Sequence, residues 1–289
     1  AAVSETAEVA KLVAGESKAS YVNAILRKVS EANNDLAELK ERPVLERLVI
    51  QYSHPEWIIS AFYDQLQDWQ KVEELLAANN LPVKPDVISW PGKSSIAELI
   101  TLGATAIDGF VNGVNLPGIP SEFEPIITRR AGVQDRGSQL VVENFLATAT
   151  ATAGLSWLDM CAGTGGKAAY LIHYLTSSDP TATFLENEPI SHRAELVKRV
   201  VNNQQVVSFD ATDAKNFSQR FDRILVDAPC TGLGALRRRP EARWRRTIKD
   251  LKELVLLQRQ LLSTAYELLN PGGVIAYVTC SPHLAETKG

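Results

Sequence analysis

Two short segments of the 289-residue chain place a cysteine directly after a predicted strand: Asp227–Gly232 and Thr279–Ser281. A lone cysteine is most often a small buried hydrophobe. Here Cys230 and Cys280 share one kind of position, and ligands of a doubly wound sheet bind beyond the carboxyl ends of its strands. This repeated placement favours two reactive thiols, because a thiolate is a strong nucleophile whose pKa falls near positive charge.

The third cysteine, Cys161, completes an odd and widely spaced set. That pattern argues against a disulfide framework and against zinc sites built on close cysteine pairs. The four histidines are scattered and show no metal-binding spacing. We therefore expect reduced thiols in a cytoplasmic protein that uses no metal.

A glycine-rich turn, Asp159–Lys167, follows the first strand of the same predicted sheet. By itself such a turn can be a plain connection from a strand to a helix. Two acids strengthen the case for a nucleotide-type cofactor. Glu188 lies about 20 residues beyond the turn, where a carboxylate accepts hydrogen bonds from ribose hydroxyls, and Asp210 ends the third strand, where it could hold an adenine amino group. Each acid could also cap a helix or a turn.

The charge is divided unevenly along the chain, whose net charge is −4. Residues 1–125 carry 10 Lys+Arg against 18 Asp+Glu, and residues 126–289 carry 20 against 16. A basic stretch with one aromatic residue follows Cys230. Such a stretch offers phosphate contacts and a stacking surface, although many charge runs are simply solvated. Its candidate RNA-binding residues are Arg237, Arg238, Arg239, Arg243, Trp244, Arg245 and Arg246.

Hydrophobic periodicity places these residues on elements. From about residue 130, strands alternate with helices, which predicts a mainly parallel, doubly wound sheet. The predicted strands are Ser156–Met160, Ala182–Leu185, Gln205–Phe209, Phe221–Val226 and Gly273–Thr279. The predicted helices are Gly165–Leu175, Ile190–Asn202 and roughly Ile248–Leu269.

The first part of the chain has a different pattern. Short amphipathic helices are predicted at Tyr21–Ser30, Pro43–Ile50, Trp57–Leu66 and Trp69–Ala77, and residues 81–128 form a small mixed α/β connecting region. With 45% hydrophobic and 22% charged residues, the composition is that of a globular protein and excludes collagen-like and wholly disordered classes. No apolar run approaches the roughly 18–20 residues of a membrane span.

These motifs together resemble those of the RNA 5-cytosine methyltransferases related to Sun, NOL and NOP proteins. Asp159–Lys167 is similar to their DxCAAPGGK loop, Asp227–Gly232 to their DAPCSG motif and Thr279–Ser281 to their TCS motif. Tyr21–Lys28 resembles the helix that closes the NusB-like domain of members acting on bacterial small-subunit rRNA, and Gly132–Leu140 resembles a VQDxxSQL segment of the same members.

The sequence departs from the family pattern in a few places. Gly163 and Thr164 stand where Ala-Pro is common, which puts cofactor affinity in doubt more than activity. Thr287 stands where an Asn often follows the glutamate matched by Glu286. The helical part is short for a whole NusB-like domain and only nine residues follow Cys280, so we expect that the chain lacks residues at both ends.

The resemblance implies a fold, a cofactor and a substrate. It predicts a remnant of a NusB-like helical RNA-binding domain at 1–50, a connecting region at 51–128, and a Rossmann-like methyltransferase domain at 129–289. The expected cofactor is S-adenosyl-L-methionine and the expected partner is small-subunit ribosomal RNA, without a membrane.

The resemblance also implies roles for residues. Cys280 would attack carbon 6 of cytosine, Cys230 would assist release of the product, Asp227 would hydrogen-bond the base, and Lys167 would lie near the substrate end of the cofactor. The predicted cofactor contacts are Cys161, Ala162, Gly163, Gly165, Gly166, Lys167, Glu188, Arg193, Asp210 and Asp227.

Two other functions remain open at this stage. One is an amino-group methyltransferase, although Ala228 and Cys230 do not fit its usual Asp/Asn-Pro-Pro-aromatic motif. The other is a non-catalytic RNA-binding or ribosome-assembly factor that retains the fold. Such a factor has no use for two cysteines and the acidic cofactor residues, so cofactor binding would separate it from an enzyme.

Overall fold

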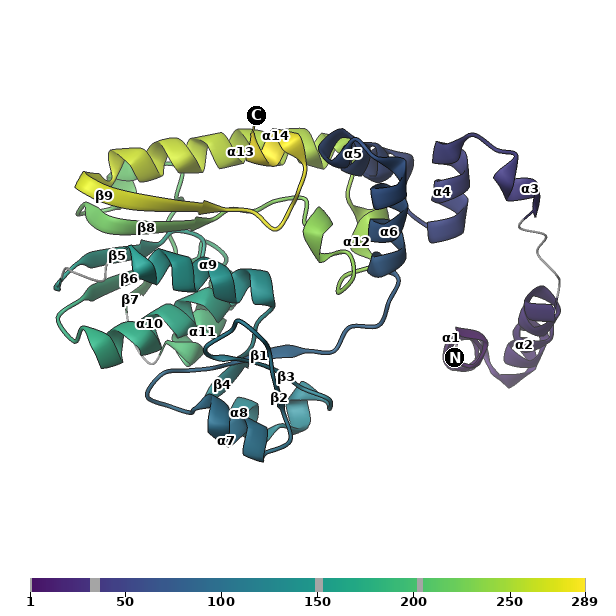
Figure 1. The fold of residues 1–289 in the computed structure, drawn as a ribbon, viewed down its shortest axis with the longest axis horizontal. Coiled ribbons are helices and arrows are strands. Elements are labelled where there is room, and N and C mark those ends of the chain that lie inside the picture. The colour runs from purple at the N-terminus through teal and green to yellow at the C-terminus, as the bar shows by residue number, and fades with distance from the viewer. Residues whose placement is uncertain (1, 32–36, 149–152, 202–204, 289) are drawn as a thin grey trace. The chain divides into compact units, whose positions relative to one another are not determined.

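The computed structural model describes residues 2–31, 37–148, 153–201 and 205–288, and the chain divides into two compact units, Ala1–Gln51 and Tyr52–Gly289. The first unit is helical (Figure 1). Its helices are α1 (Ala2–Ala14), α2 (Glu16–Glu31), α3 (Ala37–Lys40) and α4 (Val44–Tyr52). The amphipathic helix predicted at Tyr21–Ser30 lies within α2, but Tyr21 and Val29 on its apolar face are exposed.

The second unit begins with two helices and a small antiparallel sheet. The helices are α5 (Glu56–Leu66) and α6 (Trp69–Asn79), and the side chain of Asp68 caps α6 by accepting two backbone N–H groups. The sheet has the order β2-β3-β1-β4. Its strands are β1 (Asp86–Ser89), β2 (Thr105–Ala106), β3 (Gly113–Asn115) and β4 (Ala131–Val133); α7 (Ile96–Thr101), a 3₁₀ turn (Pro120–Glu122) and α8 (Glu124–Ile127) connect them.

A five-stranded, fully parallel sheet forms the rest of this unit, in the order β7-β6-β5-β8-β9. The strands are β5 (Ser156–Asp159), β6 (Thr183–Asn187), β7 (Gln205–Val207), β8 (Phe221–Asp227) and β9 (Leu269–Val278). The larger helices around it are α9 (Arg136–Ala147), α10 (Gly166–Ser178), α11 (Ser191–Val200) and α13 (Ile248–Glu267). The short ones are the 3₁₀ turns Ala214–Asn216 and Leu233–Ala235, α12 (Ala242–Arg245) and α14 (Leu284–Thr287).

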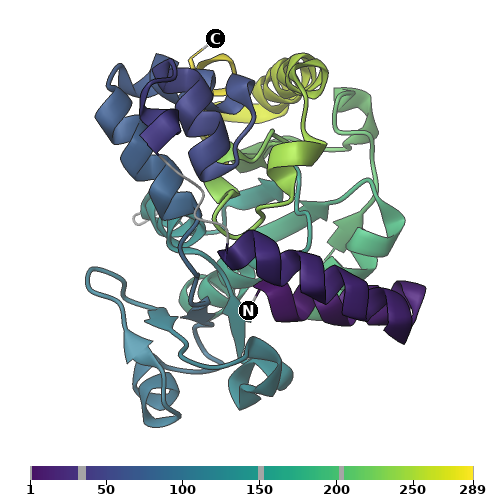
Figure 2. The ribbon, with the colours of Figure 1, turned by 90° about the vertical axis from the view of Figure 1, so that its right-hand side faces the viewer.

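Both faces of the parallel sheet are buried. Successive side chains of a strand point to opposite sides, and helices pack against each side. Leu158 packs with Ile224 against α13, whereas Trp157 packs with Leu225 against α9 and α10. Figure 2 shows α13 nearly end-on beside the sheet. The predicted Rossmann-like, doubly wound α/β fold is therefore confirmed.

The predicted elements agree with the structure except at their ends. The last strand begins at Leu269 rather than Gly273, because residues before the glycine pair already join the ladder of β8. The helix predicted at Ile190–Asn202 is α11, and Asn202 lies outside the described residues. Among the residues that the structure describes, no helix is both long and apolar enough to cross a bilayer.

Candidate active site

The two cysteine loops meet at the carboxyl edge of the parallel sheet. Cys230 follows β8 and Cys280 follows β9, and because these strands are paired in parallel their ends lie side by side. The two sulfur atoms are 3.3 Å apart, close enough to share a hydrogen bond. The prediction that two thiols gather at this edge is confirmed.

The pKa values of the two thiols shift in opposite directions. The hydrogen bond from Cys230, followed by the smaller effects of Lys167 and Arg238, lowers the pKa of Cys280 from 9.0 to about 7, although desolvation and Asp227 oppose the shift. The same hydrogen bond, together with burial, raises the pKa of Cys230. These shifts favour the thiolate at Cys280 and the protonated thiol at Cys230. The sequence predicted activation by a cation, but the main cause is the partner thiol.

A buried carboxylate ties the two cysteine loops together. Glu286 accepts hydrogen bonds from the backbone N–H of Thr231, at 2.8 Å, and from that residue's hydroxyl. It also accepts one from Gln258 on α13, at 3.0 Å. The Thr231 hydroxyl lies 2.9 Å from that of Ser281 in the other loop. Sequence reasoning found Glu286 only as a family match, because its partners lie far from it along the chain.

A glycine allows the loops to approach so closely. The backbone N–H of Gly234 donates a 2.9 Å hydrogen bond to the carbonyl oxygen of Cys280. A β-carbon at Gly234 would lie 2.9 Å from that same oxygen, closer than real side chains come. Any larger residue would therefore push the nucleophile's loop away.

An ion pair lies next to the thiols. The ammonium of Lys167, at the start of α10, lies 2.5 Å from the carboxylate of Asp227 at the end of β8. Beneath them, Asp159 is buried, and desolvation together with Asp227 raises its pKa to about 7. The predicted catalytic residues Lys167 and Asp227 thus lie in one cluster with the thiols.

The glycine-rich turn leaves open space in front of α10. No side chain caps this helix, and a β-carbon at Gly166 would meet no atom within 4 Å. Gly165 has a left-handed backbone with φ of +84°, and its β-carbon would lie 2.6 Å from Val200 on α11. The glycine therefore allows close helix packing, while the free N–H groups of the helix suit an anionic group.

The predicted cofactor residues outside the glycine-rich turn differ in how buried they are and in what they hydrogen-bond. Glu188 is buried at the end of β6 and accepts a hydrogen bond from the backbone of Ile190. Arg193 is exposed on α11. Asp210 is exposed and accepts both the N–H and the hydroxyl of Thr212, as an acid that caps its own turn does.

The remaining loop residues contribute mainly to structure. The N–H of Ala162 donates to the carbonyl of Asn187, which fastens the turn to β6. Burial raises the pKa of Cys161 and Asp159 raises it further, so this third thiol keeps its proton near neutral pH. Uncapped N–H groups, an acid at the next strand end and open space together fit an adenosyl cofactor that ends in a carboxylate.

One of the predicted RNA contacts is wrong. Arg243 is 5% exposed, and its guanidinium donates to the carbonyl of Asn79 and the side chain of Asn80, which fixes α12 to α6. Burial of this arginine could not be read from the charge run itself, because α6 lies more than 150 residues earlier.

Two further arginines of the run are exposed but already paired. Arg237 donates to the carbonyls of Leu81 and Pro82, and Arg238 forms an ion pair with Asp135 at 2.9 Å. The exposed remainder is Arg239, Trp244, Arg245 and Arg246.

Comparison with known proteins identifies relatives. Residues 147–289 match the family model described as 16S rRNA methyltransferase RsmB/F. A Mycobacterium tuberculosis protein (strain CDC 1551 / Oshkosh), provisionally named a methyltransferase, is 40% identical over 306 residues, which cover 100% of this chain and 65% of that protein. Ribosomal RNA small subunit methyltransferase B of Shewanella oneidensis is 29% identical over 291 residues, covering 97% of this chain and 65% of that protein. The chain thus spans 65% of the length of both relatives.

Two solved structures share the fold. The crystal structure of PH0851 has a TM-score of 0.80 at 22% identity, covering 97% of this chain and 64% of that chain. The structure of NSun6 from Pyrococcus horikoshii with SFG has a TM-score of 0.68 at 16% identity, covering 80% and 84%.

Proposed function

We propose that this protein methylates carbon 5 of a cytosine in small-subunit ribosomal RNA, because residues 147–289 match the family model described as 16S rRNA methyltransferase RsmB/F. The methyl donor is S-adenosylmethionine, which supplies an electrophilic methyl group when bound. The observation that carries the proposal is the thiol pair, with Cys280 activated by Cys230 at 3.3 Å. An enzyme that methylates an amino group has no need of such a pair.

The first step uses the thiolate. Carbon 5 of cytosine is a poor nucleophile until Cys280 Sγ bonds to carbon 6, which moves the electrons of the ring double bond onto carbon 5. A ring nitrogen protonated from solvent donates a hydrogen bond to the carboxylate of Asp227, and the positive charge on this nitrogen offsets the negative charge that the attack creates. The ammonium of Lys167 holds that carboxylate in place. Carbon 5 then takes the methyl group.

The second step uses the other cysteine. Once Cys280 is bonded to carbon 6, it no longer forms the hydrogen bond with Cys230. That hydrogen bond is the first cause of the raised pKa of Cys230. Cys230 can then release its own proton to solvent, and the resulting thiolate takes the proton from carbon 5. The electrons of that C–H bond restore the ring double bond, and the bond between Cys280 Sγ and carbon 6 breaks.

The RNA must present the cytosine outside any stack, because both ring carbons have to face protein groups. The exposed Arg239, Arg245 and Arg246 supply phosphate contacts beside the catalytic edge, and Trp244, 63% exposed, supplies a stacking surface. Arg243 has no part in this surface.

Labelled methyl donor and unmodified small-subunit rRNA test the reaction. We expect label on carbon 5 of one cytosine and no turnover by Cys280→Ala. Label on an exocyclic nitrogen, or turnover by Cys280→Ala, would overturn the mechanism. Cys230→Ala should accumulate a protein–RNA adduct that resists denaturation.

The cofactor site has its own test. Calorimetry should show that the chain binds S-adenosylmethionine and that Glu188→Ala weakens binding, because the ribose hydroxyls lose their acceptor. A chain that binds no cofactor at all would instead support a non-catalytic RNA-binding factor.

A further inference from the structure

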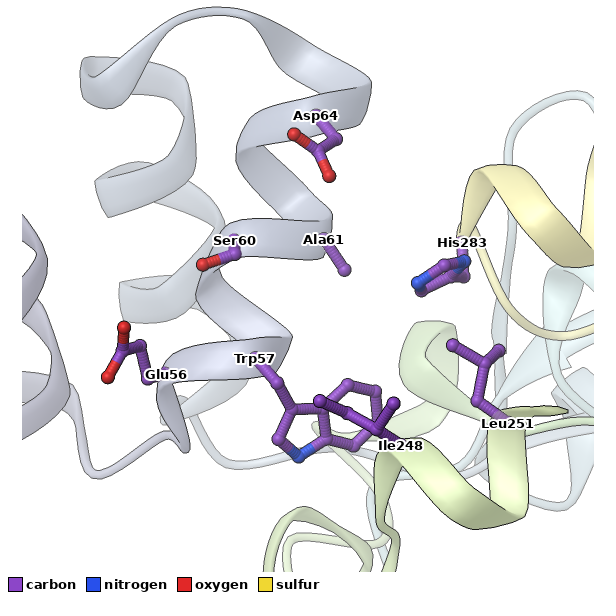
Figure 3. A pocket seen from close by; sticks show the side chains of 8 residues that line it. All are labelled: Glu56, Trp57, Ser60, Ala61, Asp64, Ile248, Leu251 and His283. Carbon is purple, nitrogen blue, oxygen red and sulfur yellow. The ribbon is translucent and has the colours of Figure 1, made fainter.

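A pocket of about 580 Å³ lies next to the loop that carries Cys280 (Figure 3). One wall is a face of α5 that includes Trp57 and Asp64, and the other wall is built by Ile248 of α13 and by His283. In Figure 3 the ring of His283 faces α5 across the pocket. The volume lies within the roughly 300–1,000 Å³ of small-ligand sites, and the proposed chemistry makes no use of it.

The pocket wall and the nucleophile belong to one hydrogen-bonded loop. His283 follows Cys280 by three residues, which span at most about 11 Å. The backbone N–H of His283 donates to the hydroxyl of Ser281 at 3.2 Å, and that hydroxyl is bonded to Thr231 in the other cysteine loop. An RNA strand whose target base is at Cys280 therefore has its neighbouring nucleotides within reach of the pocket.

Part of the lining is suited to the flat face of a base. The indole of Trp57 is half-buried, and Ile248 and Leu251 add aliphatic surface from the first turns of α13. Aromatic side chains bind unpaired bases by stacking, whatever the base. This surface provides affinity for a base without selecting which one.

The polar lining does select. Within the described part of the chain, the carboxylates of Glu56 and Asp64 have no hydrogen-bond or ion-pair partner, so both are free to accept. His283 Nδ1 accepts the N–H of Ala285, at 3.1 Å, so the ring proton is on Nε2 and can be donated. The carboxylate of Asp64 favours a base that offers an amino group, as adenine, cytosine and guanine do, over uracil, which has two carbonyls and a single ring N–H. The carboxylate of Glu56 lies on the side of α5 away from His283 (Figure 3).

The same carboxylates exclude a phosphate from the pocket by repulsion. Exposed cations lie near Ile248 in the sequence: Arg246 directly follows α12, and Lys249, in the first turn of α13, forms an exposed ion pair with Glu253 at 3.7 Å. A nucleotide can thus place its base inside and its phosphates against these cations. A free anion or an acidic peptide has no comparable fit.

We propose that this pocket holds the base of an unpaired nucleotide next to the target cytosine and prefers a base that carries an amino group. The proposal rests on the proposed function, because it takes the strand to be the RNA that Cys280 attacks. It makes Asp64 a residue that determines substrate specificity and Trp57 a residue that contributes affinity for any base.

Binding of short unpaired RNAs to the full 289-residue chain tests this directly. Each RNA has a cytosine at its centre, and its flanking nucleotides are all adenosine, all cytidine or all uridine. Its affinity is measured by fluorescence anisotropy. We expect the uridine-flanked RNA to bind about fivefold to tenfold more weakly. Equal affinity for all three RNAs would overturn the proposal. Methylation of the same RNAs is measured separately, so that a chain that binds selectively without methylating refutes only the proposed function.

Two variants with one charge removed identify the pocket as the cause. Asp64→Asn should weaken binding of the adenosine-flanked RNA about fivefold and leave the uridine-flanked RNA nearly unchanged. Glu267→Gln, which removes an exposed carboxylate from the far end of α13, is the matched control and should affect both RNAs alike. If Asp64→Asn instead strengthens binding of both RNAs, the carboxylate only repels phosphate and the pocket holds no base. Trp57→Leu should weaken binding of every RNA, and unchanged affinity would remove the stacking role.

Discussion

Substituting Cys230 tests whether its hydrogen bond to Cys280 lowers the pKa of Cys280. In Cys230→Ala, Cys280 loses the hydrogen bond that is the largest cause of its lowered pKa. In Cys230→Ser, a hydroxyl replaces the thiol and can still donate. We therefore expect the pKa of Cys280 to rise toward 9.0 in the alanine variant and to stay low in the serine variant.

The expected change in the thiolate fraction of Cys280 follows from the shift in its pKa. A fall in pKa from 9.0 to about 7 makes about half of Cys280 a thiolate at neutral pH, compared with about 1% without the shift. Lys167 and Arg238 still favour the thiolate in both variants, and because Cys280 is exposed, solvent screens part of the interaction. We expect the thiolate fraction at pH 7 to fall about tenfold in Cys230→Ala, rather than all the way to about 1%.

Alkylation by iodoacetamide measures this fraction, since only the thiolate reacts quickly. The rate of modification of the peptide that contains Cys280 is followed by mass spectrometry from about pH 6 to about pH 10. Cys161 should stay unmodified throughout, because its buried thiol keeps its proton. An identical pH midpoint in the wild-type chain and in Cys230→Ala would refute the hydrogen bond as the cause of activation.

Three further predictions concern the framework of the site. Glu286→Gln places an amide among hydrogen-bond donors and should lower the free energy of unfolding by about 1–3 kcal/mol in urea titrations; no loss would show that the carboxylate does not hold the loops. Gly165→Ala should cost about 1–3 kcal/mol, from its positive φ and its contact with α11, whereas Gly166→Ala, with open space around it, should cost less. Burial and the neighbouring Asp159 raise the pKa of Glu186 well above 4.5, so the folded chain holds a proton that the unfolded chain releases. The free energy of unfolding should therefore fall as the pH rises above about 4.5, and Glu186→Gln should reduce the difference between about pH 5 and about pH 8.

Local sequence patterns were sufficient to predict the helices and strands, and to predict which edge of the sheet carries the site. The alternation of strands and helices after residue 130 predicted the doubly wound sheet, and parallel strands bring their carboxyl ends together whatever the details of packing. For that reason Cys230 and Cys280 could be placed at one edge in advance. The same logic brought Lys167 and Asp227 beside them.

Whether a charged side chain is free could not be read from such patterns. Arg243 and Arg245 are equivalent in the sequence of the arginine run, yet α6 buries the first and leaves the second exposed. Burial depends on which distant segment packs over a residue. The charge run therefore indicated a surface but not its members.

The sequence alone determined the fold class and which residue types lie at the catalytic edge, because hydrophobic periodicity and strand direction are local properties. Only the tertiary structure decided that the two sulfur atoms lie within hydrogen-bonding distance of each other, and that Glu286 holds their loops in place. It also decided that α5 completes a pocket beside them. Each of these depends on distances of a few ångströms between residues far apart in the chain, and such distances exist only once the chain is folded.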